Sequence, residues 1–428
     1  MDNIGKDFVY IAIYVLLASL LTYTEYVSLF SFFENDIEAI CGLFFLNMLV
    51  CFGLEKATKI VSVKKSVKMI NKKVIAQNSR AKFYGIDVVR GFATCMVALA
   101  HVAYRTGEPQ LGGHKAFWGT LDGLFICVDF FFVLSGFLIA WVHFKDFGNP
   151  ARVPNYFKRR FSRIFPVYWI VLTLFIIGQF IQPSTAHPHE FTPKLILTSY
   201  FLLPNSGPTL MEVAWTLYYE IVGYLAFALL LCFGRIGGAI LAAWAAWIII
   251  ANIIAQPTEF PANFYLNAFH LEFLMGIGGA VLLRKGSIPF PRVMATVGTI
   301  VFVSMIYFRV DALTDSSNLA MRLIVGTSAS MVILGLIQAE RTGKLSIPPS
   351  LQTFGAASYS IYLTHTIIQA PTIKFGWRFF SHFPSEIWMF MVAGISIAVG
   401  YIFHRLVELP ATELVKNLVM REPAVAAE

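Results

Sequence analysis

Charged side chains are scarce in this sequence of 428 residues, where Asp, Glu, Lys and Arg together make up 14%. A soluble globular domain usually carries about a quarter charged residues, because its surface faces water. Hydrophobic residues make up 57% of the chain, and the mean hydropathy is +0.67. This composition excludes an ordinary soluble enzyme and indicates a protein with largely apolar surroundings.

Cysteine pairs and a basic leader are also lacking. The five cysteines are Cys41, Cys51, Cys95, Cys127 and Cys232. They form no Cys-x-x-Cys pair and lie in apolar segments, which excludes a disulfide framework or a zinc site, so no metal is expected. The N-terminus contains Asp2, Lys6 and Asp7 in place of a basic leader. The first apolar run is therefore expected to be a retained span and not a signal peptide.

Apolar runs of helix length are abundant. A helix that crosses a bilayer needs roughly 20 mostly apolar residues. Such runs lie near residues 8–30, 37–55, 86–104, 119–142, 164–182, 212–233, 237–255, 262–283, 293–309, 320–338, 355–372 and 385–406. The sequence therefore predicts an all-α, polytopic transmembrane helix bundle of about twelve spans. The shorter apolar segment 191–203 is expected to be interfacial or re-entrant.

Lysine and arginine gather in alternate loops between these runs. If the N-terminus is cytoplasmic, the inside loops contain Lys56–Lys82, Lys145–Arg163 and Arg284–Arg292, and the outside loops contain far fewer. This asymmetry is typical of cytoplasmic loops. It predicts a multi-pass protein of the cell membrane (the inner membrane in a Gram-negative cell) with both termini cytoplasmic. The net charge of +8 then belongs to loops and not to a nucleic-acid site.

The spans and loops predict four parts of the chain. These are a two-span hairpin at 1–55, a basic cytoplasmic linker at 56–82, a ten-span core at 83–411 and a cytoplasmic tail at 412–428. Two interpretations of the linker remain open. It is either an amphipathic helix on anionic lipid or a solvated connector.

Ionisable residues inside spans are costly and are candidates for a functional site. The third span contains Asp87, Arg90 and His101. Arg90 and His101 are eleven residues apart, about three helical turns, so they share a face roughly 16 Å apart along the axis. Asp87 is one turn from Arg90 and is expected to pair with it. The alternative places Asp87 and Arg90 at the interface and makes His101 a packing residue.

The next two spans contain small and basic residues. Asp129 and the Ser-Gly-Phe triplet at 135–137 lie deep in apolar sequence, where small residues let helices approach closely. Arg160 and Arg163 lie one turn apart where the following span begins. They are either a positive-inside anchor or a phosphate site, because guanidinium groups bind phosphate oxygens in pairs.

Two further spans carry polar stripes. Thr216 and Glu220 share a helix face, and Ser358, Tyr362 and His365 share another face at spacings of four and seven residues. A second intramembrane histidine is harder to explain by packing alone. Two histidines, a glutamate and an arginine pair together favour a catalytic or transport site.

These residues resemble the acyltransferase-3 family of multispanning membrane acyltransferases. The shared motifs, in order, are Arg-x10-His (Arg90, His101), Ser-Gly-Phe (Ser135, Gly136, Phe137), Arg-x-x-Arg (Arg160, Arg163), Trp-Ser/Thr-Leu-x-x-Glu (Trp215, Thr216, Leu217, Glu220), Ser-Tyr-x-x-Tyr-Leu-x-His (Ser358, Tyr359, Tyr362, Leu363, His365) and Glu-x-Pro (Glu408, Pro410). Each motif is weak alone, but this order across residues 83–411 is specific. The family core begins near the Arg-His helix, so the hairpin 1–55 is an addition. Some relatives carry an extracytoplasmic hydrolase-like domain, and none is expected within the 428 residues here. The membrane domain is therefore expected either to suffice or to work with a separate partner.

The resemblance implies an O-acyltransferase that uses cytoplasmic acetyl-CoA as co-substrate. The acceptor is expected to be a hydroxyl of a glycan or lipid-linked saccharide. By the resemblance, Arg160 and Arg163 bind the CoA phosphates and Arg90 lies beside the pantetheine arm. His101 acts either as general base or through a transient acyl-histidine.

Other motif residues have supporting roles by the same resemblance. Glu220, Tyr362 and His365 orient the acceptor or stabilise the oxyanion. Structural or acceptor-positioning roles fall to Asp87, Ser135, Gly136, Phe137, Trp215, Ser358 and Tyr359. The rival interpretation is a transporter or flippase that moves a saccharide or lipid without acyl transfer. A membrane scaffold is a third, but it leaves the two histidines unexplained.

Overall fold

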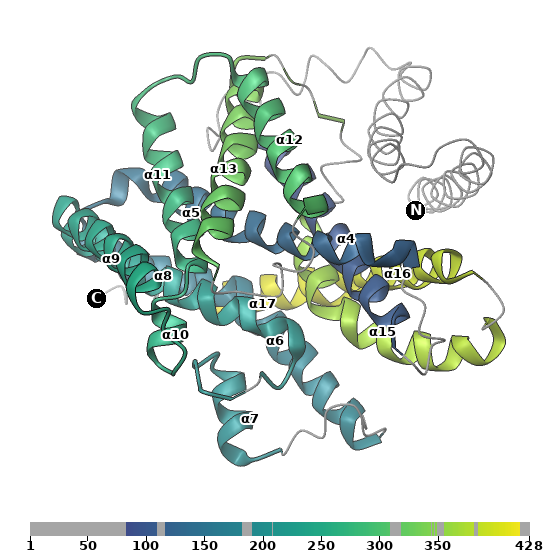
Figure 1. Cartoon of the computed structure of the whole chain (residues 1–428). Coiled ribbons are helices and arrows are strands. Elements are labelled where there is room, and N and C mark those ends of the chain that lie inside the picture. Colours follow the sequence, from purple (N-terminus) through teal and green to yellow (C-terminus); the bar gives the residue numbers. More distant parts are fainter. Residues whose placement is uncertain are drawn as a thin grey trace, which may run out of the picture. The chain divides into compact units, whose positions relative to one another are not determined.

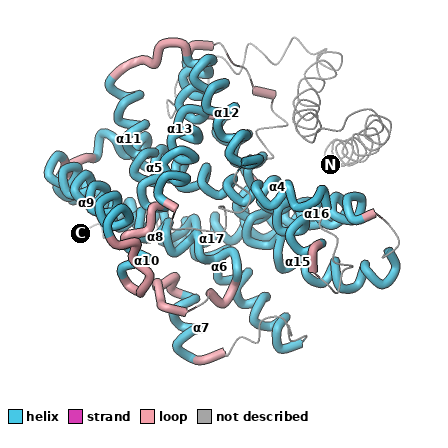
Figure 2. The backbone as a smooth tube through the Cα atoms, in the orientation of Figure 1, coloured by secondary structure: helices cyan, strands magenta, loops and turns pink. Residues whose placement is uncertain are grey.

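A computed structural model shows a helical protein. It describes residues 83–108, 116–181, 191–207, 209–308, 318–343, 345, 347–348, 355–380 and 384–419, all within one compact unit, Phe83–Glu428. The hairpin expected at 1–55, the linker at 56–82 and most of the tail lie outside the described residues. No strand occurs among the residues that the structure describes (Figure 2). The expectation of an all-α protein is confirmed for this part of the chain.

The longer helices of the described residues are labelled in Figure 1. They are α4 (Tyr84–Thr106), α5 (Cys127–His143), α6 (Val153–Ile181), α7 (Pro193–Tyr200), α8 (Trp215–Phe233), α9 (Arg235–Ile254), α11 (Phe269–Lys285), α12 (Pro291–Phe308), α13 (Leu319–Arg341), α15 (Ser358–Phe380), α16 (Ser385–Phe403) and α17 (Leu409–Val419). The 3-10 segments are η2 (Ala116–Ile126), η3 (Phe144–Asp146), η4 (Pro150–Arg152) and η5 (Glu212–Ala214), and α10 (Ala262–Tyr265) is a single α-helical turn. A π-helical turn, η7 (His404–Glu408), joins α16 to α17.

Eight helical segments of the described residues are long and apolar enough to cross a membrane. They are Tyr84–Thr106, Ala116–Asp146, Pro150–Phe180, Glu212–Phe233, Arg235–Ile254, Ala262–Lys285, Leu319–Arg341 and Ser385–Val419. A further apolar helix, Pro291–Tyr307, is shorter. The expected count of about twelve spans is therefore not confirmed, and two of the twelve lie outside the described residues.

The expected span at 355–372 forms α15, but α15 is not among the eight apolar segments. Its polar side chains are the reason. Ser358, Ser360, Thr364, His365, Thr366 and Gln369 are all buried. α15 is therefore a polar helix that turns its hydroxyl, imidazole and amide groups towards other helices. Hydropathy alone therefore does not identify such a helix as a candidate membrane span.

The segment expected to be interfacial or re-entrant forms α7. This helix has eight residues, a length of about 12 Å, which is too short to cross a bilayer. Two side chains of α6 attach to its end, because Tyr168 Oη donates to the Ser199 carbonyl at 2.8 Å and Trp169 Nε1 to the Tyr200 carbonyl at 2.8 Å. The loop that follows α7 leads to α8.

Helix α4 is held at its N-terminus by a carboxylate from α13. Both oxygens of Glu340 accept backbone N–H groups of the first turn, from Tyr84 at 2.9 Å and from Gly85 at 3.0 Å. The first N–H groups of a helix have no partner within the helix, and a negative charge there is also favoured by the helix dipole. Glu340 therefore fixes the start of the helix that carries Arg90 and His101.

Helices α5 and α11 lie against each other (Figure 1), and each has a glycine at the contact. A Cβ on Gly136 would collide with the Phe273 carbonyl, and a Cβ on Gly276 would collide with the Val133 carbonyl. The two backbones therefore touch where each helix lacks a side chain. This contact confirms the expectation that the Ser-Gly-Phe triplet lets helices approach closely.

The contact predicts different effects for two glycines of α11. Gly276→Ala should lower the midpoint of thermal unfolding in detergent, because overpacking a tight contact costs about 1–3 kcal/mol. Gly278 is the matched control, since a Cβ there meets nothing within 4 Å. Gly278→Ala should leave the midpoint unchanged or raise it, because alanine favours helix more than glycine. Equal midpoints for the two variants would contradict the close contact.

Candidate active site

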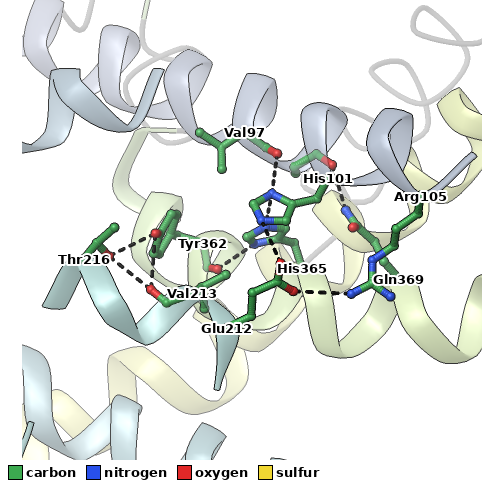
Figure 3. Close-up of polar contacts among 10 residues, drawn as sticks. Val97, His101, Arg105, Glu212, Val213, Thr216, Tyr362, His365 and Gln369 are labelled. Carbon is green, nitrogen blue, oxygen red and sulfur yellow. Dashed lines mark hydrogen bonds and ion pairs between the residues drawn. The ribbon is translucent and has the colours of Figure 1, made fainter. Parts of the chain in front are cut away.

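Two histidines meet between α4 and α15 (Figure 3). His365 Nε2 lies 3.3 Å from His101 Nδ1, with the ring centroids 4.8 Å apart. Both rings also contact backbone carbonyls of their own helices. His101 Nδ1 lies 2.9 Å from the Val97 carbonyl, and His365 Nδ1 lies 2.6 Å from the Tyr362 carbonyl. The structure therefore brings together two histidines that are 264 residues apart in the chain.

These contacts determine which ring nitrogens carry hydrogen. A carbonyl oxygen only accepts hydrogen bonds, so Nδ1 of each ring must be the protonated nitrogen. His365 Nε2 is then an acceptor for the Nδ1–H of His101, which is shared with the Val97 carbonyl. His101 Nε2 is left with a lone pair. The neutral His101 ring is thus oriented to accept a proton at Nε2.

A glutamate lies beside this open nitrogen. Glu212 Oε1 is 3.9 Å from His101 Nε2, and Glu212 Oε2 is 3.4 Å from Arg105 Nη2, one turn further along α4. The Glu212 side chain is 60% exposed. Its negative charge favours the imidazolium form once His101 has taken up a proton. Sequence reasoning did not single out Glu212, although it is the first residue of the span expected at 212–233.

A cavity of about 180 Å³ adjoins His101. Its lining includes Phe125, Glu212, Tyr362 and an ion pair between Asp129 and Arg322. Tyr362 Oη lies 2.9 Å from Thr216 Oγ1 and 3.3 Å from the Val213 carbonyl, which joins α15 to the start of α8. Tyr362 therefore reaches the cavity from a fixed position. We call this space the histidine cavity.

An ion pair forms part of the wall of the histidine cavity. Arg322 Nη1 of α13 lies 2.5 Å from Asp129 Oδ1 of α5, and both side chains are almost fully buried. Glu272 of α11 is also fully buried and interacts electrostatically with both. Arg322 lies over the ring of Phe269, with 4.2 Å between guanidinium carbon and ring centroid. Sequence reasoning missed Arg322 and Glu272, although each is an ionisable residue inside an apolar span.

Glu220 belongs to a different group from the histidines. Its Oε1 accepts hydrogen bonds from Ser135 Oγ at 2.9 Å and from the Tyr224 hydroxyl. The side chain of Arg160 lies over the Tyr224 ring, 5.7 Å from its centroid. Glu220 is a described residue but does not line the histidine cavity. The structure therefore places it near the start of α6 and not beside His101.

Arg90 is held by neighbours on two helices. Its Nη2 lies 3.1 Å from Asp87 Oδ1, which confirms the expected pair within α4. Its Nε donates to Ser358 Oγ at 2.7 Å, and its Nη2 to the Gly355 carbonyl at 2.8 Å. Arg90 also interacts electrostatically with Arg163. Arg90 thus links α4 to the start of α15, with the arginine pair of α6 nearby.

The side chains of the arginine pair make only some of the hydrogen bonds that they can form. Arg160 Nε is buried and has no hydrogen-bond partner among the described residues, and Arg163 is exposed. The next motif residue on this side, Tyr359, donates its hydroxyl to the Ile164 carbonyl at 3.0 Å. A buried guanidinium nitrogen without a partner is suited to an incoming anion. Among described residues, no three His, Cys, Asp or Glu side chains are grouped to hold a metal ion.

Two aromatic motif residues, Phe137 and Trp215, pack against neighbouring rings. Phe137 is buried and stacks on Trp141 with 5.7 Å between centroids. Trp215 lines the histidine cavity and lies 5.1 Å from Phe269 between ring centroids. Phe137 is therefore a packing residue of the α5 region. Trp215 is a wall of the site.

Comparison with known proteins finds relatives that are 24% to 28% identical to this chain. Exopolysaccharide production protein ExoZ of Rhizobium meliloti (strain 1021) is 27% identical over 64% of this chain and 85% of that protein. Acyltransferase MdmB of Streptomyces mycarofaciens is 28% identical over 79% of this chain and 93% of that protein. Putative peptidoglycan O-acetyltransferase YrhL of Bacillus subtilis (strain 168) is 24% identical over 70% of this chain and 51% of that protein. No solved structure matches the chain.

The family comparison covers most of the chain. A family model described as an acyltransferase domain, Acyl_transf_3, matches residues 83–405. This range contains the histidine pair, the arginine pair and every apolar helix from α4 to α16. The protein is a multi-pass membrane protein that belongs to the acyltransferase-3 family of acyltransferases.

Proposed function

We propose that this membrane acyltransferase transfers an acetyl group from cytoplasmic acetyl-CoA to a hydroxyl group of a saccharide, free or lipid-linked. The observation that carries the proposal is the open Nε2 of His101, which faces a cavity while Nδ1 is held by the Val97 carbonyl and His365. Two relatives support the substrate class by name, an exopolysaccharide production protein and a putative peptidoglycan O-acetyltransferase.

The arginine pair is the proposed donor site. Arg160 and Arg163 bind phosphate groups of CoA, and the buried, unpartnered Nε of Arg160 supports this role. With cytoplasmic termini, the basic start of α6 faces the cytoplasm. The pantetheine arm then passes Arg90 and runs along α4 towards His101, roughly 16 Å further along the helix. The charged end of CoA stays near water while the thioester reaches the histidine cavity.

The transfer proceeds by proton removal at His101. Nε2 takes the proton of the acceptor hydroxyl as its oxygen attacks the thioester carbonyl. The imidazolium, stabilised by Glu212, then returns the proton to the departing CoA thiolate. His365 holds the His101 ring, and Tyr362 stabilises the oxyanion. In the alternative route the same Nε2 attacks the thioester carbonyl first, and CoA leaves as its thiolate. The acceptor hydroxyl then takes the acyl group from the acyl-histidine and its proton goes to the thiolate.

Contacts in the structure favour supporting roles for the other motif residues. Glu220, with Ser135 and Tyr224, supports the start of α6 and so the donor site. Asp87 and Ser358 hold Arg90. The protein acts in the cell membrane, and its partners are acyl-CoA, the saccharide acceptor and the bilayer.

Replacement of His101 tests the general base. His101→Ala should lower acetyl transfer by at least about 10²-fold, because the proton acceptor is lost. Transfer is measured with purified protein in lipid nanodiscs, labelled acetyl-CoA and glycans from cells that lack the gene. Asn252→Ala, which removes a buried polar side chain of α9 outside the cavity, is the control. Equal elution in size-exclusion chromatography shows that both variants remain folded. Retained transfer in His101→Ala would refute the assignment.

Replacement of the arginine pair tests the donor site. Arg160→Ala and Arg163→Ala should each raise the KM for acetyl-CoA about 10- to 100-fold, because each removes a charged hydrogen bond to phosphate. Arg152→Ala is the control, since Arg152 is exposed at the same end of α6 and pairs with Asp146. A wild-type protein that moves saccharide without consuming acetyl-CoA would indicate a transporter instead.

A further inference from the structure

We propose that a second cavity, next to the histidine cavity, binds an uncharged sugar ring of the acceptor. The second cavity has a volume of about 340 Å³ and is lined by Asn205, Trp215, Tyr219, Phe264, Phe269 and Arg322, among others. We call it the aromatic cavity. The inference rests on the proposed function, because a sugar here is an acceptor only if transfer occurs at His101.

The two cavities share a wall. Trp215, Phe269 and Arg322 line both of them. Of these, Trp215 lies at the first turn of α8, about 14 Å along that helix from Tyr224, which contacts Arg160. The aromatic cavity is therefore next to the histidines and far from the arginine pair. A ring bound there places a hydroxyl group close to His101 without crossing the donor site.

Aromatic rings provide the apolar faces of the aromatic cavity. Centroid distances are 4.5 Å for Tyr219 and Phe264, 5.4 Å for Tyr219 and Phe269, and 5.1 Å for Trp215 and Phe269. Rings packed so closely have few alternative positions. A sugar ring has one face of C–H groups and a rim of hydroxyl groups. The C–H face matches a fixed aromatic surface, and the rim needs a few placed polar groups.

Asn205 offers such a polar group. Its Oδ1 accepts the Gly207 N–H at 2.8 Å, which orients the amide. Its Nδ2 is then a buried donor, and it has no hydrogen-bond partner among the described residues. A donor in this position loses free energy unless a ligand or water accepts its hydrogen. A sugar hydroxyl is an acceptor of the required kind.

The charges of the aromatic cavity favour a neutral ligand. Arg322 is the one cationic side chain among the described lining residues, and Asp129 Oδ1 already lies 2.5 Å from it. Glu272, next to this pair, adds a second carboxyl group. A phosphate or a uronate would have to displace Asp129 from Arg322 and would leave the Asp129 carboxylate buried without its partner. An uncharged ring meets no such penalty.

Equilibrium binding tests the ligand class. The full chain in lipid nanodiscs is mixed with methyl β-D-glucopyranoside, methyl β-D-galactopyranoside, methyl α-D-mannopyranoside or methyl α-L-rhamnopyranoside, and binding is followed by saturation-transfer NMR against empty nanodiscs. At least one glycoside should bind. The matching methyl uronide, with a carboxylate in place of the C6 group, should bind at least about tenfold more weakly. No binding by any of the four, or equal or tighter binding of the uronide, would overturn the proposal.

Matched variants test the location. Asn205→Ala and Phe264→Ala should raise the dissociation constant of the glycoside about fivefold or more. Ser206→Ala and Tyr265→Ala are the controls, because these neighbours are exposed and do not line the cavity. Unchanged binding in both Asn205→Ala and Phe264→Ala would place the sugar elsewhere.

The same measurements distinguish this inference from the proposed function. His101→Ala should bind the glycoside like the wild type, since His101 does not line the aromatic cavity. A wild-type protein that binds the sugar but does not consume acetyl-CoA refutes the transferase and leaves the sugar site. Intact acetyl transfer, with unchanged acceptor affinity in Asn205→Ala and Phe264→Ala, refutes the sugar site alone.

Discussion

The contact between α4 and α15 is the constraint on which the site depends. Arg90 binds Ser358 and the Gly355 carbonyl at one end, and His101 meets His365 further along both helices. Because the two contacts occur in the same order along each chain segment, the helices run in the same direction. Glu340 fixes the start of α4. The orientation of the His101 ring therefore depends on contacts at three points of one helix.

Burial in an apolar bundle explains why these polar groups occur in pairs. An unpaired charge or donor in such surroundings is costly, so partners are favoured, and several of them lie on another helix. Arg322 and Asp129 join α13 to α5, and Ser135 and Glu220 join α5 to α8. The few groups left without a partner then stand out. Arg160 Nε and Asn205 Nδ2 are two of them among the described residues, and they lie in the two proposed binding sites.

Sequence spacing predicted the features that lie within one helix. The Asp87–Arg90 pair and the shared face of Ser358, Tyr362 and His365 follow from helical geometry, and α15 presents all three to neighbouring helices. Contacts between helices, such as Asp129 with Arg322, depend on packing that no local spacing encodes. Glu220 shows the limit of such predictions. Its spacing from Thr216 predicts that both side chains point to the same side of α8, but it does not predict how far along the helix axis Glu220 lies from His101. One turn moves Glu220 about 6 Å along α8, towards Tyr224 and Ser135.

The proposed donor and acceptor sites divide the chemistry between two ends of the bundle. CoA carries phosphates, whose transfer into apolar surroundings is prohibitive, so on this proposal its charged end stays at Arg160 and Arg163. A neutral sugar ring has no such restriction and can enter the aromatic cavity beside Trp215. Only the uncharged thioester and one hydroxyl group then have to meet in the histidine cavity. On this assignment, His101 acts on two neutral reacting groups, and the single charge that develops on its ring lies next to Glu212.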